Sequence, residues 1–168
     1  KQLREGINLK EASEADIEAA MVGLNRINNS AGGEKASVLR AELQTIMQNY
    51  FGVFRRGDFM KEGIDKLNAL RPRIENVALE DKSNAFNTAR IEALELQNLF
   101  ATAEATAIAA EGRTESRGAH AREDFQERDD ENWLCHSVYF PESKTLGKRG
   151  VNFTLKTREA FEPKIRTY

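Results

Sequence analysis

The sequence has 168 residues, with 25 Lys and Arg against 27 Asp and Glu, so its formal net charge is −2. This near balance gives no overall electrostatic reason to bind nucleic acid or an anionic lipid surface. The single cysteine, Cys135, excludes an internal disulfide and suits a reducing compartment. No apolar run approaches the roughly 18 residues that a bilayer span requires, so we expect a soluble chain without direct membrane insertion.

The length suits one domain with an extended tail, because a chain of about 150 residues buries roughly 70% of its unfolded surface. The first six residues contain neither an initiator Met nor an apolar targeting core. This start favours a segment from the interior of a longer protein, although cleavage of a leader would also produce it.

The first expected helix follows Ser13, whose side chain can accept backbone N–H bonds as an N-cap. Glu14 and Asp16 favour the positive end of the helix dipole. Apolar residues then recur every three or four positions and predict one buried face, formed by Ile17, Met21, Leu24 and Ile27. Residues 28–33 are rich in Asn, Ser and Gly and predict a turn.

Two further helices are expected before residue 80. The second has an apolar stripe that ends near residues 52–57, and the stripe comprises Leu39, Leu43, Ile46 or Met47, and Tyr50. The third can be capped by Asp58, and its inner face comprises Met60, Ile64, Leu67, Ile74 and Val77. Pro72 cannot donate a backbone hydrogen bond and predicts a kink or break there.

The fourth and longest helix is expected to begin between Ser83 and Asn87. Its stripe comprises Phe86, Ala93, Leu96, Phe100, Ala103 and Ala107, widened by Ile91 and Leu94. Small side chains in residues 101–110 permit close helix approach, and Gly112 suits a position just after the helix end. Short connections favour antiparallel neighbours.

Beyond this helix the composition changes. Residues 113–132 are dense in charge. Residues 133–140 are β-prone, residues 147–150 suit a turn, and residues 151–155 suit a second strand. Residues 162–168 suit an extended end. The sequence therefore predicts a mainly α protein. Residues 1–112 would form an antiparallel three- or four-helix bundle of the up-and-down, spectrin-like kind. Residues 113–168 would form a charged docking segment, a small β-hairpin and an extended C-terminal tail.

No reaction centre is predicted in this chain. The glycines form neither a GxGxxG unit between a strand and a helix nor a GxxxxGK[ST] loop, so no site for a dinucleotide or a flavin pyrophosphate is expected. His120, Cys135 and His136 lack the spacing of a metal site. On a strand, Cys135 and His136 would point to opposite faces, which also argues against a Cys–His nucleophilic pair.

The charged segment has two interpretations. It is either a solvated loop or a network of Arg–carboxylate pairs that docks the chain on another domain. Because exposed pairs contribute only about 0–1 kcal/mol each, a useful network must be partly buried at an interface. The candidate docking residues are Arg113, Glu115, Arg117, His120, Arg122, Asp124, Arg128, Asp129 and Asp130.

The same segment carries a specific resemblance. Residues 113–120 (RTESRGAH), 122–124 and 128–137 (RDDENWLCHS) closely resemble the C-terminal part of succinate dehydrogenase flavoproteins, and the ESRG-x-H element is shared with fumarate reductases and L-aspartate oxidases. The resemblance extends over essentially the whole chain, through residues 47–50, 54–55, 57–58, 86–88, 94–96, 139–143 and 163–168. Gln126 departs from it, because family members commonly carry proline there, which makes the local turn less defined.

The resemblance implies a parent enzyme that oxidises succinate to fumarate with covalently bound FAD and passes electrons through an iron–sulfur subunit towards quinone. In that family the flavin-binding, substrate-binding and catalytic residues lie N-terminal to this segment, so none is assigned here. The implied partners are the FAD-binding domain of the same subunit, the iron–sulfur subunit and the membrane-anchor subunits. The implied location is the cytoplasmic side of the inner membrane, or the matrix side in mitochondria.

Two alternatives accompany this hypothesis. The chain could be the C-terminal domain of a related fumarate reductase or L-aspartate oxidase flavoprotein. It could instead be an autonomous helical adaptor that binds unrelated partners through residues 113–132. In the preferred hypothesis the chain itself is inactive and supports the FAD domain and the assembly.

Overall fold

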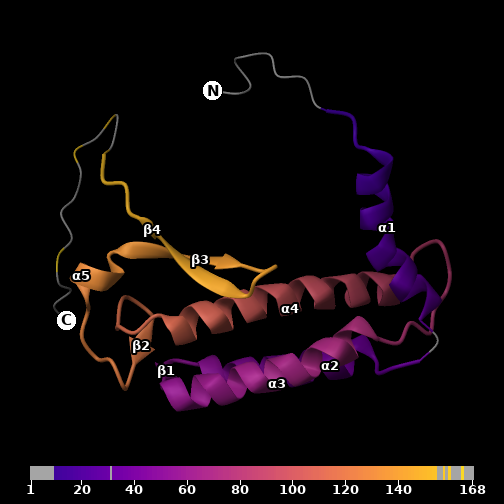
Figure 1. The fold of residues 1–168 in the computed structure, drawn as a ribbon. Coiled ribbons are helices and arrows are strands. Elements are labelled where there is room, and N and C mark those ends of the chain that lie inside the picture. The colour runs from indigo at the N-terminus through magenta and orange to yellow at the C-terminus, as the bar shows by residue number, and fades with distance from the viewer. Residues whose placement is uncertain (1–9, 31, 155–156, 158, 160–163, 165–168) are drawn as a thin grey trace. The chain divides into compact units, whose positions relative to one another are not determined.

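The computed structural model describes residues 10–30, 32–154, 157, 159 and 164 (Figure 1). The fold is mainly helical with a small antiparallel β-hairpin, as the sequence predicted. In chain order the elements are α1 (Glu14–Asn29), α2 (Ala36–Phe51), β1 (Phe54–Arg55), α3 (Gly57–Glu75), α4 (Thr88–Gly112), β2 (Ala121–Arg122), α5 (Asp130–Trp133), β3 (Cys135–Phe140) and β4 (Thr145–Gly150). Within the described part of the chain, no helix combines the length and the apolar character that a membrane crossing needs.

The described residues form two compact units, one within residues 10–43 and 69–100 and the other within residues 44–68 and 101–164. The first unit contains the beginning of α2, the end of α3 and the beginning of α4. The second contains the end of α2, the beginning of α3 and the end of α4. Helix α3 therefore runs antiparallel to α2 and α4, which is the expected up-and-down order.

The core of the first unit follows the predicted stripes of the second and fourth helices. Its buried apolar residues are Ile27, Ala36, Leu39, Leu43, Leu70, Ile74, Val77, Leu79, Ala93, Leu96 and Phe100. Arg73 at the end of α3 adds an ionic contact, because its guanidinium donates to the carboxylates of Glu34 and Glu42 at distances between 2.7 and 2.9 Å.

Helix α1 confirms one prediction and contradicts another. Ser13 is the N-cap and forms a reciprocal capping box, in which its Oγ accepts from the Asp16 N–H and its own N–H donates to Asp16 Oδ2, both at 3.2 Å. The predicted buried face is wrong over most of its length. Ile17 is 54% and Met21 43% exposed, and Ile27 is the buried residue of this helix. Helical periodicity identifies an apolar face, but burial requires an element to cover it.

Helices α3 and α4 depart from expectation at their ends. Helix α3 does not break at Pro72 and continues to Glu75. Proline removes the single hydrogen bond that its N–H would donate, and only three helical residues follow Pro72. It begins at Gly57, so Asp58 lies in its first turn rather than at the cap. Phe86 is wrong as a core residue, since it is fully exposed at φ 51°, and Ile91 is also exposed. Asn87 Oδ1 accepts from the Arg90 N–H at 2.8 Å and caps α4.

The hairpin is displaced from its expected position. Strand β3 begins at Cys135, with Trp133 in α5, and β4 spans Thr145–Gly150, so residues 147–150 form a strand rather than a turn. The actual turn is formed by residues 141–144, where Lys144 has a φ of 52°. A strand over residues 151–155 is wrong for the described residues 151–154. Of the predicted extended end, residues 162–168, all but Lys164 lie outside the described residues.

Gly112 has a different role from the one predicted. It is the last residue of α4 and does not have the positive φ of a residue that follows a helix. A Cβ on Gly112 would lie 2.8 Å from Leu146 Cδ2. The glycine therefore permits the close approach of β4 to the end of α4.

Candidate functional site

A short parallel pairing places the charged segment within the second unit. Phe54 pairs with Ala121 and Arg55 with Arg122, and the Glu123 N–H donates to the Arg55 carbonyl at 2.8 Å. The preceding turn is closed by reciprocal backbone hydrogen bonds between Arg117 and His120. The pairing holds His120 and Arg122 beside β1, which joins α2 to α3.

Arg122 belongs to β2, but its side chain lies at the C-terminal end of α4, and the residue is only 4% exposed. Its Nη1 donates to the carbonyls of Ala110, Glu111 and Arg113 at 3.3, 2.9 and 3.2 Å. The last carbonyls of a helix have no partner within the helix and carry its negative dipole end, so a guanidinium there is favourable.

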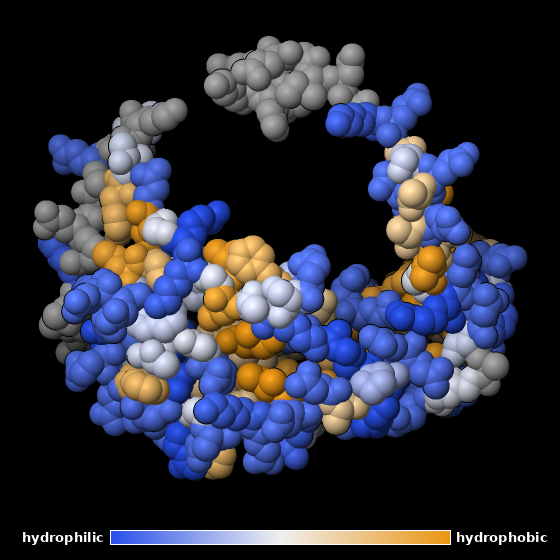
Figure 2. All heavy atoms as spheres, in the orientation of Figure 1, coloured by the Kyte–Doolittle hydropathy of each residue, from blue (hydrophilic) through white to orange (hydrophobic). Residues whose placement is uncertain are grey.

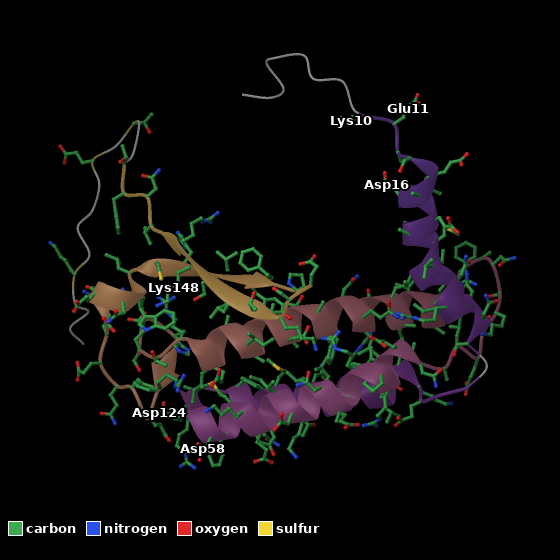
Figure 3. All side chains as sticks on the ribbon, viewed as in Figure 1. Lys10, Glu11, Asp16, Asp58, Asp124 and Lys148 are labelled. Carbon is green, nitrogen blue, oxygen red and sulfur yellow. The ribbon has the colours of Figure 1, made fainter. Side chains whose placement is uncertain are left out.

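Asp124 binds the other edge of the same guanidinium. Its two oxygens accept from Arg122 Nε at 2.6 Å and Nη2 at 2.7 Å, and Oδ2 also accepts from the Gly57 N–H at 2.9 Å. The hydrogen bonds from Arg122, aided by the one from Gly57, lower the pKa of Asp124 to about 2 against the opposing effect of burial. Figure 3 shows Asp124 beside Asp58 at the start of α3. One ion pair thus joins the end of α4 to the start of α3.

Glu115 is the fully buried centre of a second cluster, with 0% exposure. Its carboxylate accepts from Arg117 Nε and Nη2 at 2.8 and 2.9 Å, from Arg113 Nε at 2.8 Å and from the Asp129 N–H at 2.9 Å. Burial acts to raise the pKa of Glu115, but the hydrogen bonds from Arg117, Asp129 and Arg113 together outweigh it, so the pKa is lowered.

The outer part of this cluster is more exposed. Arg117 Nη2 and Arg128 Nη2 donate to different oxygens of Asp130, each at 2.6 Å. Asp129 caps α5, since its Oδ1 accepts from the Asn132 N–H at 2.9 Å. The acidic run therefore shapes a helical turn as well as binding the arginines.

His120 connects β1 with the end of α4. Arg55 Nη1 lies 2.7 Å from Nδ1 of the imidazole, and because arginine has only donors, Nδ1 must accept. The Nε2 atom lies 3.1 Å from the Arg113 carbonyl, so it carries the proton and donates. Burial, reinforced by the charges of Arg55, Arg122 and Arg113, lowers the pKa of His120 and favours this neutral tautomer.

All nine candidate residues participate in these hydrogen bonds, which form among residues of the second unit. The ion pairs join carboxylates and arginines of the same segment, so their role in docking another domain stays a prediction. Sequence reasoning missed Arg55 as a member of the cluster. Its Nε donates to the carbonyls of Phe51 and Gly52, and its place just after a predicted helix end was the available signal.

Trp133 was missed as an anchor. Its ring has Lys148 Nζ 3.5 Å from the centroid and the guanidinium of Arg113 at 5.2 Å, and its Nε1 donates to Thr114 Oγ1 at 3.1 Å. These contacts join α5 and β4 to the start of the charged segment. The sequence signal was the single tryptophan of the chain, at the first position of the β-prone stretch.

The thiol of Cys135 and the imidazoles of His136 and His120 have different surroundings. Cys135 and His136 occupy successive positions of β3 and therefore opposite faces, and His136 is exposed. Both ring nitrogens of His120 contact Arg55 and Arg113 rather than Cys135. Among the described residues no group of three or more His, Cys, Asp or Glu side chains is placed to hold a metal ion.

A pocket of about 390 Å³ lies next to the network, lined by Phe54, Ser116, Ala121, Arg122, Glu123 and Gln126. The Arg122 guanidinium is directed to Asp124 and to the helix carbonyls, and Glu123 contributes a carboxylate. A flavin pyrophosphate needs free donors and a positive potential, which this lining does not provide. No step of flavin chemistry is therefore assigned to these residues.

Comparison with known proteins gives a consistent result. A family model described as "Fumarate reductase flavoprotein C-term" matches residues 40–168. The chain is 46% identical over 151 residues to a succinate dehydrogenase flavoprotein subunit from Coxiella burnetii, covering 90% of this chain and 26% of that protein. It is 39% identical over 155 residues to a mitochondrial succinate dehydrogenase [ubiquinone] flavoprotein subunit from Oryza sativa subsp. japonica, covering 90% and 25%.

Solved structures share the fold. E. coli quinol fumarate reductase FrdA aligns with a TM-score of 0.75 at 33% identity, over 91% of this chain and 27% of that chain. The Mycobacterium smegmatis Sdh1 complex in the apo form aligns with a TM-score of 0.73 at 29% identity, over 94% and 27%. The chain thus spans about a quarter of the length of the proteins that it matches.

Proposed function

Because this chain belongs to the succinate dehydrogenase and fumarate reductase flavoprotein family and corresponds to its C-terminal domain, we propose that it supports a flavin domain that oxidises succinate to fumarate. The observation that carries the proposal is the 46% identity to a succinate dehydrogenase flavoprotein subunit across 90% of this chain. FAD bound in the remainder of the subunit would accept the electrons. This chain would stabilise the flavin domain.

The proposal assigns different roles to the two parts of the chain. Residues 1–112 would be the helical scaffold, and residues 113–168 would include the docking segment. The network suits docking because its internal hydrogen bonds hold the arginines in place before binding, which lowers the entropy lost on association. Arg117, Arg128 and Asp130 keep 26%, 25% and 39% of their side-chain surface exposed and can contact a partner.

The names of relatives support the proposed partners. One relative is a succinate dehydrogenase [ubiquinone] flavoprotein subunit, and a solved neighbour is a quinol–fumarate reductase with menaquinol molecules. We therefore propose that the parent subunit passes electrons through an iron–sulfur subunit to quinone. Membrane-anchor subunits would hold the complex at the cytoplasmic face of the inner membrane, or at the matrix face in mitochondria.

A chimaera tests this function. This chain replaces the matching C-terminal quarter of the Coxiella burnetii subunit, and the same subunit truncated before that quarter is the control. We expect the chimaera to retain flavin through gel filtration and to reduce an acceptor dye with succinate, and the truncated control to lose flavin. A monomeric, folded chimaera without flavin would contradict the proposal, as would a truncated control that keeps full flavin occupancy.

A second candidate function is fumarate reduction, favoured by the name of the family model and by the alignment with E. coli quinol fumarate reductase. The ratio of succinate oxidation to fumarate reduction in the complete parent enzyme would distinguish the two directions. Family membership favours the scaffold role over the autonomous adaptor. Among the comparisons named above, the relatives are dehydrogenases or reductases, which favours either of these functions over L-aspartate oxidation.

A further inference from the structure

The pocket of about 390 Å³ beside β1 and β2 has an exposed aromatic ring in its wall. Phe54 lies opposite Ala121 in the parallel pairing. Because the methyl group of alanine is too small to cover a phenyl ring, Phe54 stays 77% exposed. Figure 2 shows a small apolar patch among hydrophilic atoms at the position that Figure 1 labels β2. The β1–β2 pocket, as we call it, therefore offers an aromatic face to a ligand.

Arginine covers the other exposed phenylalanines of this compact unit's charged region but not Phe54. The guanidinium of Arg56 lies 4.1 Å from the centroid of Phe59, and that of Arg122 lies 5.0 Å from the centroid of Phe125. Within the described part of the chain, no guanidinium or ammonium group lies over the ring of Phe54. An aromatic face attracts cations, so the ring that lines the pocket remains available to one.

The donors in the pocket lining are already in use, whereas acceptors remain. The guanidinium of Arg122 is hydrogen-bonded along both edges, and Ser116 Oγ donates to the Phe125 carbonyl at 2.8 Å. Gln126 Nε2 donates to the Glu123 carbonyl at 3.3 Å. No described residue donates a hydrogen bond to the carboxylate of Glu123. A ligand that supplies donors would complement this lining.

The cations near the pocket are paired with other carboxylates. Arg56 interacts with Glu123 through its charge, but its Nε and Nη2 donate to the two oxygens of Asp58 at 2.6 and 2.7 Å. Asp124 pairs with Arg122 in the same bidentate way. The pocket lining therefore keeps the negative charge of Glu123, which favours a cationic ligand over an anionic one.

We propose that the β1–β2 pocket binds a guanidinium group, which stacks on the ring of Phe54 and donates to the carboxylate of Glu123. A guanidinium suits both contacts at once, because its plane stacks on aromatic faces and its edge carries a rigid fork of donors. The volume lies near the lower end of the roughly 300–1,000 Å³ of small-molecule sites, so the ligand has about the size of one side chain. The site is built within one compact unit and does not depend on the proposed function.

Titration of the ¹⁵N-labelled 168-residue chain with n-butylguanidinium tests the proposal. The amide resonances of residues 54 and 121–126 should shift and saturate. The matched control ligand is n-butylurea, which has nearly the same planar shape but no charge. We expect n-butylurea to bind about tenfold more weakly, because charge-assisted hydrogen bonds are stronger than neutral ones. Equal binding of the two compounds, or shifts confined to residues outside the pocket, would overturn the proposal.

Variants at exposed positions separate the two contacts. Glu123→Gln should weaken binding of n-butylguanidinium about tenfold through loss of the charged acceptor, and Phe54→Leu should weaken it about threefold through loss of the aromatic face. Glu127→Gln and Phe59→Leu are the matched controls, because both residues are exposed and neither lines the pocket. Circular dichroism verifies that each variant folds. Equal effects of the pocket and control variants would contradict the assignment.

A second pair of ligands distinguishes the two sources of a guanidinium. The pair is an end-blocked tripeptide with arginine between two glycines and the same tripeptide with citrulline, the neutral urea counterpart of arginine. If the arginine peptide binds more tightly than n-butylguanidinium, the natural ligand is an arginine side chain of a polypeptide; if not, it is a free guanidino compound. Either result supports the proposal only when Glu123→Gln weakens the binding, and unaltered binding to this variant would refute it.

Discussion

Arg122 and Asp124 form a bidentate ion pair, with Nε–Oδ1 and Nη2–Oδ2 distances of 2.6 and 2.7 Å, and this pair joins two helix ends. Arg122 simultaneously caps the carbonyls of α4, and Asp124 accepts from the first residue of α3. The pair is asymmetric, because the side chain of Arg122 is 2% exposed and that of Asp124 is 31% exposed. Loss of the carboxylate would therefore leave a buried charge without its counter-ion.

Asp124→Asn should lower the free energy of unfolding by about 2–3 kcal/mol. This is less than the roughly 3–5 kcal/mol expected for a fully buried pair, because Asp124 is partly solvated. Urea denaturation followed by circular dichroism measures the change. Asp58→Asn is the control, because the Arg56–Asp58 pair is exposed and its loss should leave the denaturation midpoint nearly unchanged. Equal effects of the two variants would show that the Arg122 pair is not structurally important.

Arg117→Ala should destabilise the chimaera and reduce its flavin retention more than it changes the turnover of molecules that keep flavin. Glu115 would remain buried with Arg113 and the Asp129 N–H as donors, so we expect a loss of about 2–3 kcal/mol. Thermal melting, flavin content and kcat per flavin separate these effects. Arg128→Ala is the matched control, since Arg128 binds Asp130 at the outer side of the cluster. Normal melting and normal flavin content in Arg117→Ala would refute the buried-pair proposal.

The acidic network should make folding stability depend on pH in a defined direction. The folded-state pKa of Asp124 is about 2 against an ordinary value of 3.8, and the pKa of Glu115 is also lowered. A depressed carboxyl pKa stabilises the fold above the unfolded-state value, and that contribution is lost as pH falls through the folded-state value. We expect the free energy of unfolding to begin to fall near pH 4.5, the ordinary pKa of Glu115, and to continue falling between pH 3.8 and about 2 as Asp124 is protonated, with a shallower slope in Asp124→Asn. An unchanged slope would contradict this assignment.

His120→Gln should remove a separate part of the pH dependence. The pKa of His120 is lowered from 6.5, so the unfolded chain takes up its proton first and stability falls as pH drops below 6.5. Glutamine can accept from Arg55 and donate to the Arg113 carbonyl without titrating. Chemical denaturation between pH 5 and pH 7.5 should give a flatter profile for His120→Gln. The exposed His136→Gln is the control, and a profile that changes only in this control would exclude the His120 assignment.

Two glycines within helices should respond to alanine in opposite directions. A Cβ at Gly63 would lie 2.5 Å from Tyr50 Cβ and 2.6 Å from Phe51 Cε2, so Gly63→Ala should cost about 1–3 kcal/mol through overpacking. Gly23 in α1 has nothing within 4 Å of the same position, and Gly23→Ala should add up to about 1 kcal/mol through helix propensity. Thermal melts of the isolated chain measure both variants. Stabilisation by Gly63→Ala would show that the α2–α3 contact is looser than described.

Local signals in the sequence were sufficient for the helices. The Ser13 N-cap, the stripe of Leu39, Leu43 and Ile46, and the long fourth helix depend on neighbours within a few residues, and the structure confirms all three. The same local reasoning failed for the hairpin. Gly147 and Gly150 resembled turn residues, yet they lie in β4, and Gly147 leaves space for the ring of Phe140 across the pair.

The sequence by itself determined the helical class, the family and the set of charged residues that matter, because these follow from composition, periodicity and motifs along the chain. Only the tertiary structure decided which charges meet. It placed Arg55 against His120 and Arg122 against both Asp124 and the end of α4. It also left Ile17 and Met21 exposed, which periodicity had predicted to be buried. The physical reason is that burial and ion pairing depend on which distant segments come together, and a repeat of 3.6 residues carries no information about them.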